Sequence, residues 1–321
     1  MLKILLSLVL IFSCSKTPTT LKLGFIVKQP DEPWFQLEWK FAEEASKKYG
    51  FELIKIAATD GEKVLSAIDN LAANGASGFV ICTPDVRLGP AIKMKAEAAG
   101  LKMISVDDQF IGADGKAMTE VAYLGISARE IGKSVGTNLY AEMKKRNWKI
   151  EEVGAAIVTF DEMETGRERT EGAIESLLAS GFPQDKIHKI AMKTSDIPGS
   201  FDAVNILLTQ MPKVKKWLIS GLNDNAVLGA VRAMEGRGFK AENIIGIGIN
   251  GSEAVVEFEK KNVTGLYASI LLSAKEHGYS TTEMLYKWVK EGVEPKKDTR
   301  TTGVLITRDN FLSVLKEQGI R

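Results

Sequence analysis

Short runs of apolar residues alternate with longer amphipathic stretches along nearly the whole of this 321-residue chain. This alternation predicts strands and helices in turn, which is typical of parallel sheets covered by helices on both faces. The runs are apolar throughout rather than at every second position, as expected for strands that are buried on both sides. The predicted strands are 22–28, 51–58, 76–82, 102–107, 121–126, 153–160, 187–193, 215–222, 244–250 and 265–271.

Two similar domains are predicted from the distribution of these runs. Five of the strands precede residue 127 and five follow it, while the segment 127–146 has no strand and joins the two halves. The last stretch, 273–321, is predicted to hold a helix at 276–291, a proline-containing loop, a short strand at 304–307 and a final helix. The predicted fold class is therefore α/β, with two doubly wound parallel-sheet domains between which the chain crosses more than once.

The first 20 residues are predicted to be a leader and a tether rather than part of the fold. Lys3 precedes a nine-residue apolar run, 4–12, which is too short to span a bilayer and is typical of a secretory signal. The sequence Ile-Phe-Ser-Cys that ends at Cys14 resembles a bacterial lipobox, which predicts lipidation of Cys14 and a lipid anchor. The alternative is an ordinary signal with an incidental cysteine. Under both interpretations the protein is exported.

Composition and motifs argue against several classes of function. The formal net charge of +1 gives no electrostatic basis for nucleic acid or acidic lipid as the main partner. Two cysteines and two histidines are too few for a disulfide framework or a Cys/His metal cluster, and the common hydrolase motifs are missing. The segment 246–251 matches the dinucleotide pattern G-x-G-x-x-G, but its first two glycines fall inside a predicted strand. We therefore expect no catalysis, no cofactor and no metal.

Hydrogen-bonding residues follow nearly every predicted strand. The first strand stops at Lys28, and a loop with two prolines and two acids leads to the adjacent aromatics Trp34 and Phe35. Later strands lead into Asp107 and Asp108 and, in the second half, into asparagines. In open parallel sheets, ligands bind outside the carboxyl ends of the strands. Carboxylates, amides and cations together suit the hydroxyl groups of a sugar, which both donate and accept, and an aromatic ring suits its apolar face.

Helix capping is the alternative explanation for several of these residues, because Asp and Asn are common N-caps. Asp224 and one of the pair Asp107 and Asp108 are expected to act as caps or as supports behind the ligand. His188 and His277 fall at unrelated places in the chain and are expected to be structural or at the surface.

Long strings of the sequence carry a resemblance to a known family. They include, in this order, LGFIVKQPDEPWFQ, GFVICTPD, VDDQF, WLISGLND and FKAENIIGIGINGSEAV, and the resemblance runs from about Leu21 to about Phe311. The chain resembles the bacterial periplasmic sugar-binding proteins of the two-domain, type I class, and most closely their L-arabinose-binding members. The resemblance implies a monomer in the periplasm, or at the outer face of the cytoplasmic membrane, that delivers a monosaccharide to an ABC-type permease.

The resemblance also implies two lobes that close over the sugar, joined by a hinge of three crossovers near Ala128, Ser273 and Gly303. The expected lobes are 21–127 plus 274–303 and 128–273 plus 304–321. Carriage of a ligand to a chemoreceptor is compatible with the same fold. Binding of a different pentose or hexose is the main alternative. A sugar-responsive transcription regulator is a more distant one, because it would need a DNA-binding segment where this chain has its predicted signal.

The family's sugar-contacting positions can be carried over one by one. The implied ligand-binding residues are Lys28, Glu32, Trp34, Phe35, Cys82, Asp107, Asp108, Met163, Thr165, Arg169, Leu222, Asn223, Asn250 and Glu253. Arg169 is expected at the ring oxygen of the sugar and an adjacent hydroxyl. Ile126 stands where the family has a methionine, and Glu253 where it has an aspartate. These two departures bear on the preferred sugar, for which L-arabinose is the first expectation and galactose or fucose the next.

Overall fold

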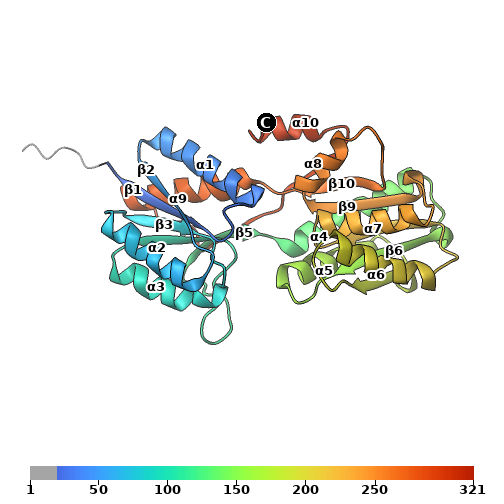
Figure 1. The fold of residues 1–321 in the computed structure, drawn as a ribbon, viewed down its shortest axis with the longest axis horizontal. Coiled ribbons are helices and arrows are strands. Elements are labelled where there is room, and N and C mark those ends of the chain that lie inside the picture. Colours follow the sequence, from blue (N-terminus) through green and yellow to red (C-terminus); the bar gives the residue numbers. More distant parts are fainter. Residues whose placement is uncertain (1–19) are drawn as a thin grey trace, which may run out of the picture.

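The computed structural model describes residues 20–321, so the predicted signal and Cys14 lie outside the described residues. The chain forms two lobes, each built on a six-stranded sheet, and Figure 1 shows them side by side. Between residues 20 and 321, none of the helices combines the length and apolar character that a membrane span requires. The predicted α/β class with two doubly wound sheets is confirmed.

The first lobe is formed by the start of the chain and by a later return. Its sheet has the strand order β11-β5-β4-β3-β1-β2, and every neighbouring pair is parallel. Its elements are β1 (Lys22–Val27), α1 (Pro33–Tyr49), β2 (Glu52–Ala57), α2 (Gly61–Ala73), β3 (Gly78–Ile81), η1 (Val86–Leu88), α3 (Gly89–Ala98), β4 (Lys102–Asp107), β5 (Ala122–Ile126), the π-helical segment η5 (Glu276–Ser280), α9 (Thr281–Glu291) and β11 (Asp298–Thr301).

The second lobe repeats this plan with the strand order β12-β10-β9-β8-β6-β7. All its neighbouring pairs are parallel except β10 with β12, which is antiparallel. Its elements are α4 (Ala128–Lys145), η2 (Ile150–Glu152), β6 (Val153–Thr159), α5 (Glu164–Ala179), η3 (Gln184–Lys186), β7 (Ile187–Ala191), α6 (Ile197–Gln210), β8 (Lys216–Gly221), α7 (Asp224–Gly236), η4 (Ala241–Asn243), β9 (Ile244–Asn250), α8 (Ser252–Glu259), β10 (Leu266–Leu271), β12 (Val304–Thr307) and α10 (Phe311–Glu317).

Both faces of each sheet are buried, which explains the continuously apolar strands. In β6, Ala155 and Ile157 belong to one hydrophobic cluster, whereas Ala156 and Val158 belong to another. Successive side chains of a strand point to opposite faces, so the two clusters are the two helix-covered sides of one sheet. The edge strands β2 and β7 are only partly buried, and they accordingly carry charged residues among the apolar ones.

The chain passes between the lobes three times: from β5 to α4, from β10 to η5, and from β11 to β12. The third link is the shortest, because only Thr302 and Gly303 separate the two strands. Gly303 has a φ of 80°, and a Cβ atom there would lie 2.6 Å from the carbonyl oxygen of Leu271. The third link therefore runs directly beside the end of β10, and a glycine is needed at that point.

Strand β11 was not predicted, and the interpretation of its residues as loop was wrong. Its sequence is Asp-Thr-Arg-Thr, and only Thr301 among its residues is buried. The strand lies at the edge of the sheet, paired with β5 alone. An edge strand needs little apolar surface, so the periodicity that identified the other strands does not reveal it.

Helices α4 and α5 pack with their backbones in close contact. A Cβ atom at Gly132 in α4 would overlap the carbonyl oxygen of Arg169 in α5. Such an approach is possible only for a residue without a side chain. The position of α4, which follows the first crossover, therefore sets the position of α5 and of Arg169 on it.

Substitution of Gly132 by alanine is expected to lower the free energy of unfolding by about 1–3 kcal/mol, because the added methyl group must push α4 and α5 apart. Gly236→Ala is the matched control, since Gly236 ends α7 and a methyl group added there would have nothing within 4 Å. Urea unfolding followed by circular dichroism measures both. Equal unfolding midpoints for the two variants would contradict the close packing inferred here.

Candidate functional site

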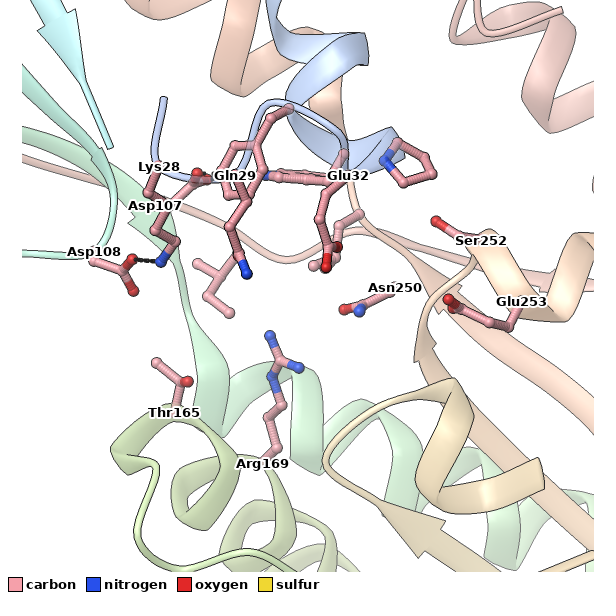
Figure 2. A pocket seen from close by; sticks show the side chains of 15 residues that line it. Lys28, Gln29, Glu32, Asp107, Asp108, Thr165, Arg169, Asn250, Ser252 and Glu253 are labelled. Carbon is pink, nitrogen blue, oxygen red and sulfur yellow. Dashed lines mark hydrogen bonds and ion pairs between the residues drawn. The ribbon is translucent and has the colours of Figure 1, made fainter. Parts of the chain in front are cut away.

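A cavity of about 260 Å³ lies between the lobes and is lined by residues of both. Figure 2 shows Lys28, Gln29 and Glu32 from the first lobe facing Arg169 and Asn250 from the second across a common space. The lining residues are Lys28, Gln29, Glu32, Pro33, Trp34, Phe35, Asp107, Asp108, Ile126, Thr165, Arg169, Asn250, Ser252, Glu253 and Leu272. They follow the carboxyl ends of parallel strands, as the general rule for ligand sites in such sheets requires.

Most of the residues predicted to bind ligand line this cavity, but Cys82, Met163, Leu222 and Asn223 do not. Met163 precedes α5 and is 43% exposed. Asn223 caps α7, where its side-chain oxygen accepts the backbone N–H of Ala226 at 2.9 Å. Helix capping was the alternative explanation for Asp and Asn residues at strand ends. The hydrogen bond of Asn223 is a capping bond.

Cys82 and Leu222 are buried directly behind lining residues. The Cys82 Sγ atom lies 3.7 Å from Oδ2 of Asp108, and the carbonyl oxygen of Leu222 accepts a hydrogen bond from Nη1 of Arg169 at 2.6 Å. Burial raises the pKa of the Cys82 thiol well above its usual value, so the thiol keeps its proton and can donate to the carboxylate. Both residues thus support a side chain that faces the cavity.

Lys28 and Asp108 form an ion pair on the wall of the first lobe. Burial alone would lower the pKa of Lys28, but the charge of Asp108 and the hydrogen bond to it hold that pKa above its usual value. The ammonium group therefore stays charged inside the cleft and keeps N–H donors for a ligand. It also lies 6.0 Å from the centre of the Phe35 ring.

Asp107 points away from this pair, toward the interior of the first lobe. Its φ is 65°, an unusual value for a residue other than glycine, and its carboxylate accepts from Nε1 of Trp34 at 3.3 Å. Nδ1 of His277 lies 2.6 Å from the same carboxylate oxygen. Burial would raise the pKa of Asp107, but the hydrogen bond and the charge of His277 hold it below its usual value. The carboxylate is therefore ionised and fixed by two side chains.

Among the cavity-lining residues of the second lobe, Arg169 carries the positive charge. It is only 8% exposed, and its Nε atom is buried without a hydrogen-bond partner among the described residues. Burial lowers the pKa of Arg169 to about 10, and the nearby charges of Asp224 and Asp108 oppose this effect. The guanidinium is still protonated at neutral pH, with donor capacity left over for a ligand.

Asn250 reaches the cavity from a backbone turn that Asp224 holds from behind. The φ of Asn250 is 103°, and Oδ2 of Asp224 accepts two backbone N–H groups that follow it, from Gly251 at 2.9 Å and Ala254 at 3.1 Å. Burial raises the pKa of Asp224 to about 7. A Cβ atom at Gly248 would overlap the Asp224 carboxylate, and one at Gly246 would crowd Val227, so the first two glycines of the G-x-G-x-x-G segment serve packing around β9.

His277 is the principal residue that sequence reasoning missed. It is fully buried, in agreement with a structural role, but it contacts Asp107, which lines the cavity. The two residues lie 170 positions apart, and no motif links them. Gln29, Ser252 and Leu272 also line the cavity without having been predicted.

Glu38, Asp107 and His277 present ligand atoms within 4.8 Å of one another, as metal ligands would. However, the 2.6 Å between the His277 nitrogen and the Asp107 oxygen is a direct hydrogen bond. Two atoms that share a zinc ion at about 2.0–2.2 Å in tetrahedral geometry must lie farther apart than this. Asp107 and His277 are therefore placed to share a proton, while Glu38 lies beside them without a hydrogen bond to any described residue.

The cavity combines cationic donors, carboxylate acceptors, an amide that does both, and aromatic rings. Among its lining residues there is no pairing of a nucleophile with a base. This set suits an uncharged ligand with many hydroxyl groups, because each hydroxyl needs both a donor and an acceptor.

Comparison with known proteins shows which family the chain is similar to. A family model described as periplasmic binding proteins and sugar binding domain of the LacI family matches residues 20–314. The chain is 54% identical over 316 residues to the L-arabinose-binding periplasmic protein of Escherichia coli (strain K12), covering 98% of this chain and 96% of that one. It is 46% identical over 307 residues to the ABC transporter L-arabinose-binding periplasmic protein of Azospirillum brasilense, with 95% and 92% covered.

Solved structures of low sequence identity share the fold. The periplasmic ribose ABC transporter protein from Conexibacter woesei matches with a TM-score of 0.77 at 19% identity, over 92% of this chain and 95% of that one. AraP, an arabinose binding protein from Geobacillus stearothermophilus, matches with a TM-score of 0.70 at 18% identity, over 91% and 98%. On the strength of the family model and the two relatives, the chain belongs to the periplasmic binding proteins and sugar-binding domains of the LacI family.

Proposed function

We propose that the protein binds a monosaccharide between its two lobes, outside the cytoplasm, and delivers it to an ABC-type permease. The observation that carries the proposal is a cavity lined from both lobes by ionised donors and acceptors. The names of the two relatives support L-arabinose as the sugar and an ABC transporter as the destination. No chemical reaction is part of the proposal.

Lobe closure follows from the distribution of the polar groups. Lys28, Asp108 and Glu32 belong to the first lobe, whereas Arg169 and Asn250 belong to the second. A sugar pairs all of these groups only when the lobes approach each other, so it binds the closed form more tightly and shifts the population toward it. Closure would then give the permease a signal that sugar is present.

Ile126 and Glu253 are the two lining residues at which we expect sugar preference to be set. Ile126 ends β5 beside the first crossover, and Glu253 lies in the first turn of α8. A branched apolar side chain and a long carboxylate both limit the shape of the ligand. Galactose and fucose are the second candidates for this reason.

Isothermal titration of the purified protein with L-arabinose, D-galactose, D-fucose, D-ribose and D-glucose tests the function. We expect L-arabinose to bind most tightly, with galactose and fucose weaker. Tightest binding of a different sugar would assign the change of preference to Ile126 and Glu253. An absence of binding by all five sugars would refute the proposal while leaving the family assignment intact.

Arg169→Ala is expected to weaken sugar binding about 100-fold or more, because hydrogen bonds to charged groups contribute about 1.5–3 kcal/mol each. Cys82→Ala is expected to weaken it less than about tenfold, since the thiol acts only through Asp108. Titration calorimetry measures both, with thermal unfolding as the control for intact folding. Equal losses of affinity would contradict this ranking.

A further inference from the structure

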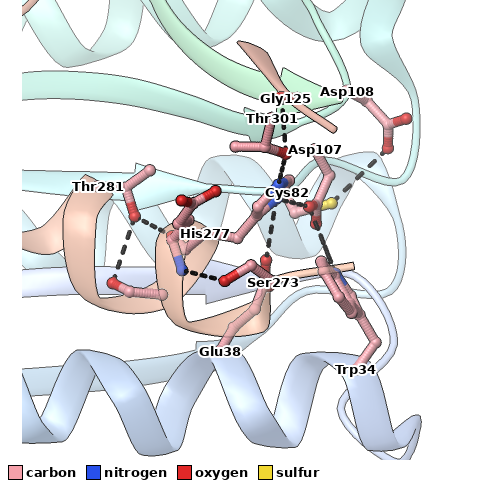
Figure 3. Close-up of polar contacts among 12 residues, drawn as sticks. Trp34, Glu38, Cys82, Asp107, Asp108, Gly125, Ser273, His277, Thr281 and Thr301 are labelled. Atoms are coloured by element: carbon pink, nitrogen blue, oxygen red, sulfur yellow. Dashed lines mark hydrogen bonds and ion pairs between the residues drawn. The ribbon is translucent and has the colours of Figure 1, made fainter. Parts of the chain in front are cut away.

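All three links between the lobes run close to one buried imidazole (Figure 3). His277 lies in η5, shortly after the link from β10, and Thr301 is the last residue of β11, immediately before the link to β12. Gly125 lies in β5, which leads into the link to α4. His277 is fully buried, so its ring nitrogens must find partners inside the protein.

The imidazole has a partner at each nitrogen. Nδ1 lies 2.6 Å from Oδ1 of Asp107, and Nε2 lies 3.0 Å from Oγ1 of Thr301. The Thr301 hydroxyl lies in turn 3.3 Å from the carbonyl oxygen of Gly125. Because an ionised carboxylate can only accept, Nδ1 must donate to Asp107. One chain of hydrogen bonds thus runs from a lining residue of the cavity to the strands that enter the links.

The backbone around His277 is built to hold this orientation. A Cβ atom at Gly278 would overlap the carbonyl oxygen of Glu38, so the π-helical segment lies directly against α1. Thr281 donates to the carbonyl oxygen of His277 across the wide π turn. Segments of π-helix are rare and occur often at functional sites. His277 lies in this one.

Among the acidic groups around the imidazole, Asp107 is the ionised carboxylate that contacts it. Oε1 of Glu38 lies 3.8 Å from Nδ1, and Lys28 and Asp108 pair with each other nearby. Burial, with the charge of Asp107, raises the pKa of Glu38 well above its usual value, so this carboxyl is neutral. Trp34, which donates to Asp107, packs edge-on against the imidazole with ring centres 5.2 Å apart.

We propose that His277 is a positioning residue for the sugar site: it fixes the Asp107 carboxylate beside Trp34 and joins it through Thr301 to the links between the lobes. Sugar contact at the cavity wall is thereby coupled to the hinge. This inference rests on the proposed function, because its affinity test needs a bound sugar.

Two substitutions separate the two hydrogen bonds of the imidazole. His277→Asn places an amide N–H where Nδ1 stood and so keeps the hydrogen bond to Asp107. His277→Gln places an amide N–H where Nε2 stood and so keeps the hydrogen bond to Thr301. We expect sugar affinity to stay within about threefold for His277→Asn and to fall at least about tenfold for His277→Gln, since a charge-assisted bond is lost. His188→Asn, on the edge strand β7, is the matched control and should bind as the unchanged protein does.

Equal sugar affinities for His277→Asn and His277→Gln would overturn the positioning role. Thermal unfolding of each variant shows whether it folds. If either does not, the coupling is decided by nitrogen NMR of the unchanged full chain, which contains only two histidines. We expect added sugar to shift the ring-nitrogen signals of His277 and to leave those of His188 in place. Unmoved His277 signals at saturating sugar would overturn the coupling.

The link from His277 to the hinge is tested without sugar. Thr301→Val removes the hydroxyl and nearly keeps the shape of the side chain, so it should shift the Nε2 signal of His277 in the free protein. An unchanged signal would overturn the proposed chain of bonds. If the unchanged protein binds no sugar, the proposed function fails, whereas this measurement still decides whether the His277–Thr301 contact exists.

Discussion

Charged side chains that are withdrawn from water must have partners, and this constraint shapes the cleft. Asp108 accompanies Lys28, and the Leu222 carbonyl accompanies Arg169. Each partner comes from the same lobe as the charge it serves. Both lobes can therefore separate without leaving a buried charge unpaired, which would be costly. Arg169 and Lys28 nonetheless keep free N–H groups that only a ligand or water can use.

Contacts within each lobe support the residues that face the cleft. Asp224 holds the turn that presents Asn250, and the close packing of α4 on α5 holds Arg169. Neither contact crosses between the lobes. Each half of the binding site is therefore preorganised. Ligand binding must fix only the orientation of one lobe relative to the other.

Much of the fold could be predicted because its strands are buried on both faces and are apolar throughout. The same reasoning missed β11, since Asp298–Thr301 is polar and lies at the sheet edge. Residues at strand ends were found because the topology gathers them at one edge. Asn223 illustrates the limit of this rule, since its side chain bonds to its own helix. His277 could not be found, because only the return of the chain after β10 brings it beside Asp107.

The two-residue link between β11 and β12 restricts how the lobes can move. Three peptide units span at most roughly 11 Å, so the ends of these strands cannot drift apart. The two remaining links pass nearby. In the lobe closure proposed above, three short links that lie so close together favour rotation of one lobe about a single axis. Arg169 would then return to the same place opposite Lys28 each time the lobes close, without a large interface between them.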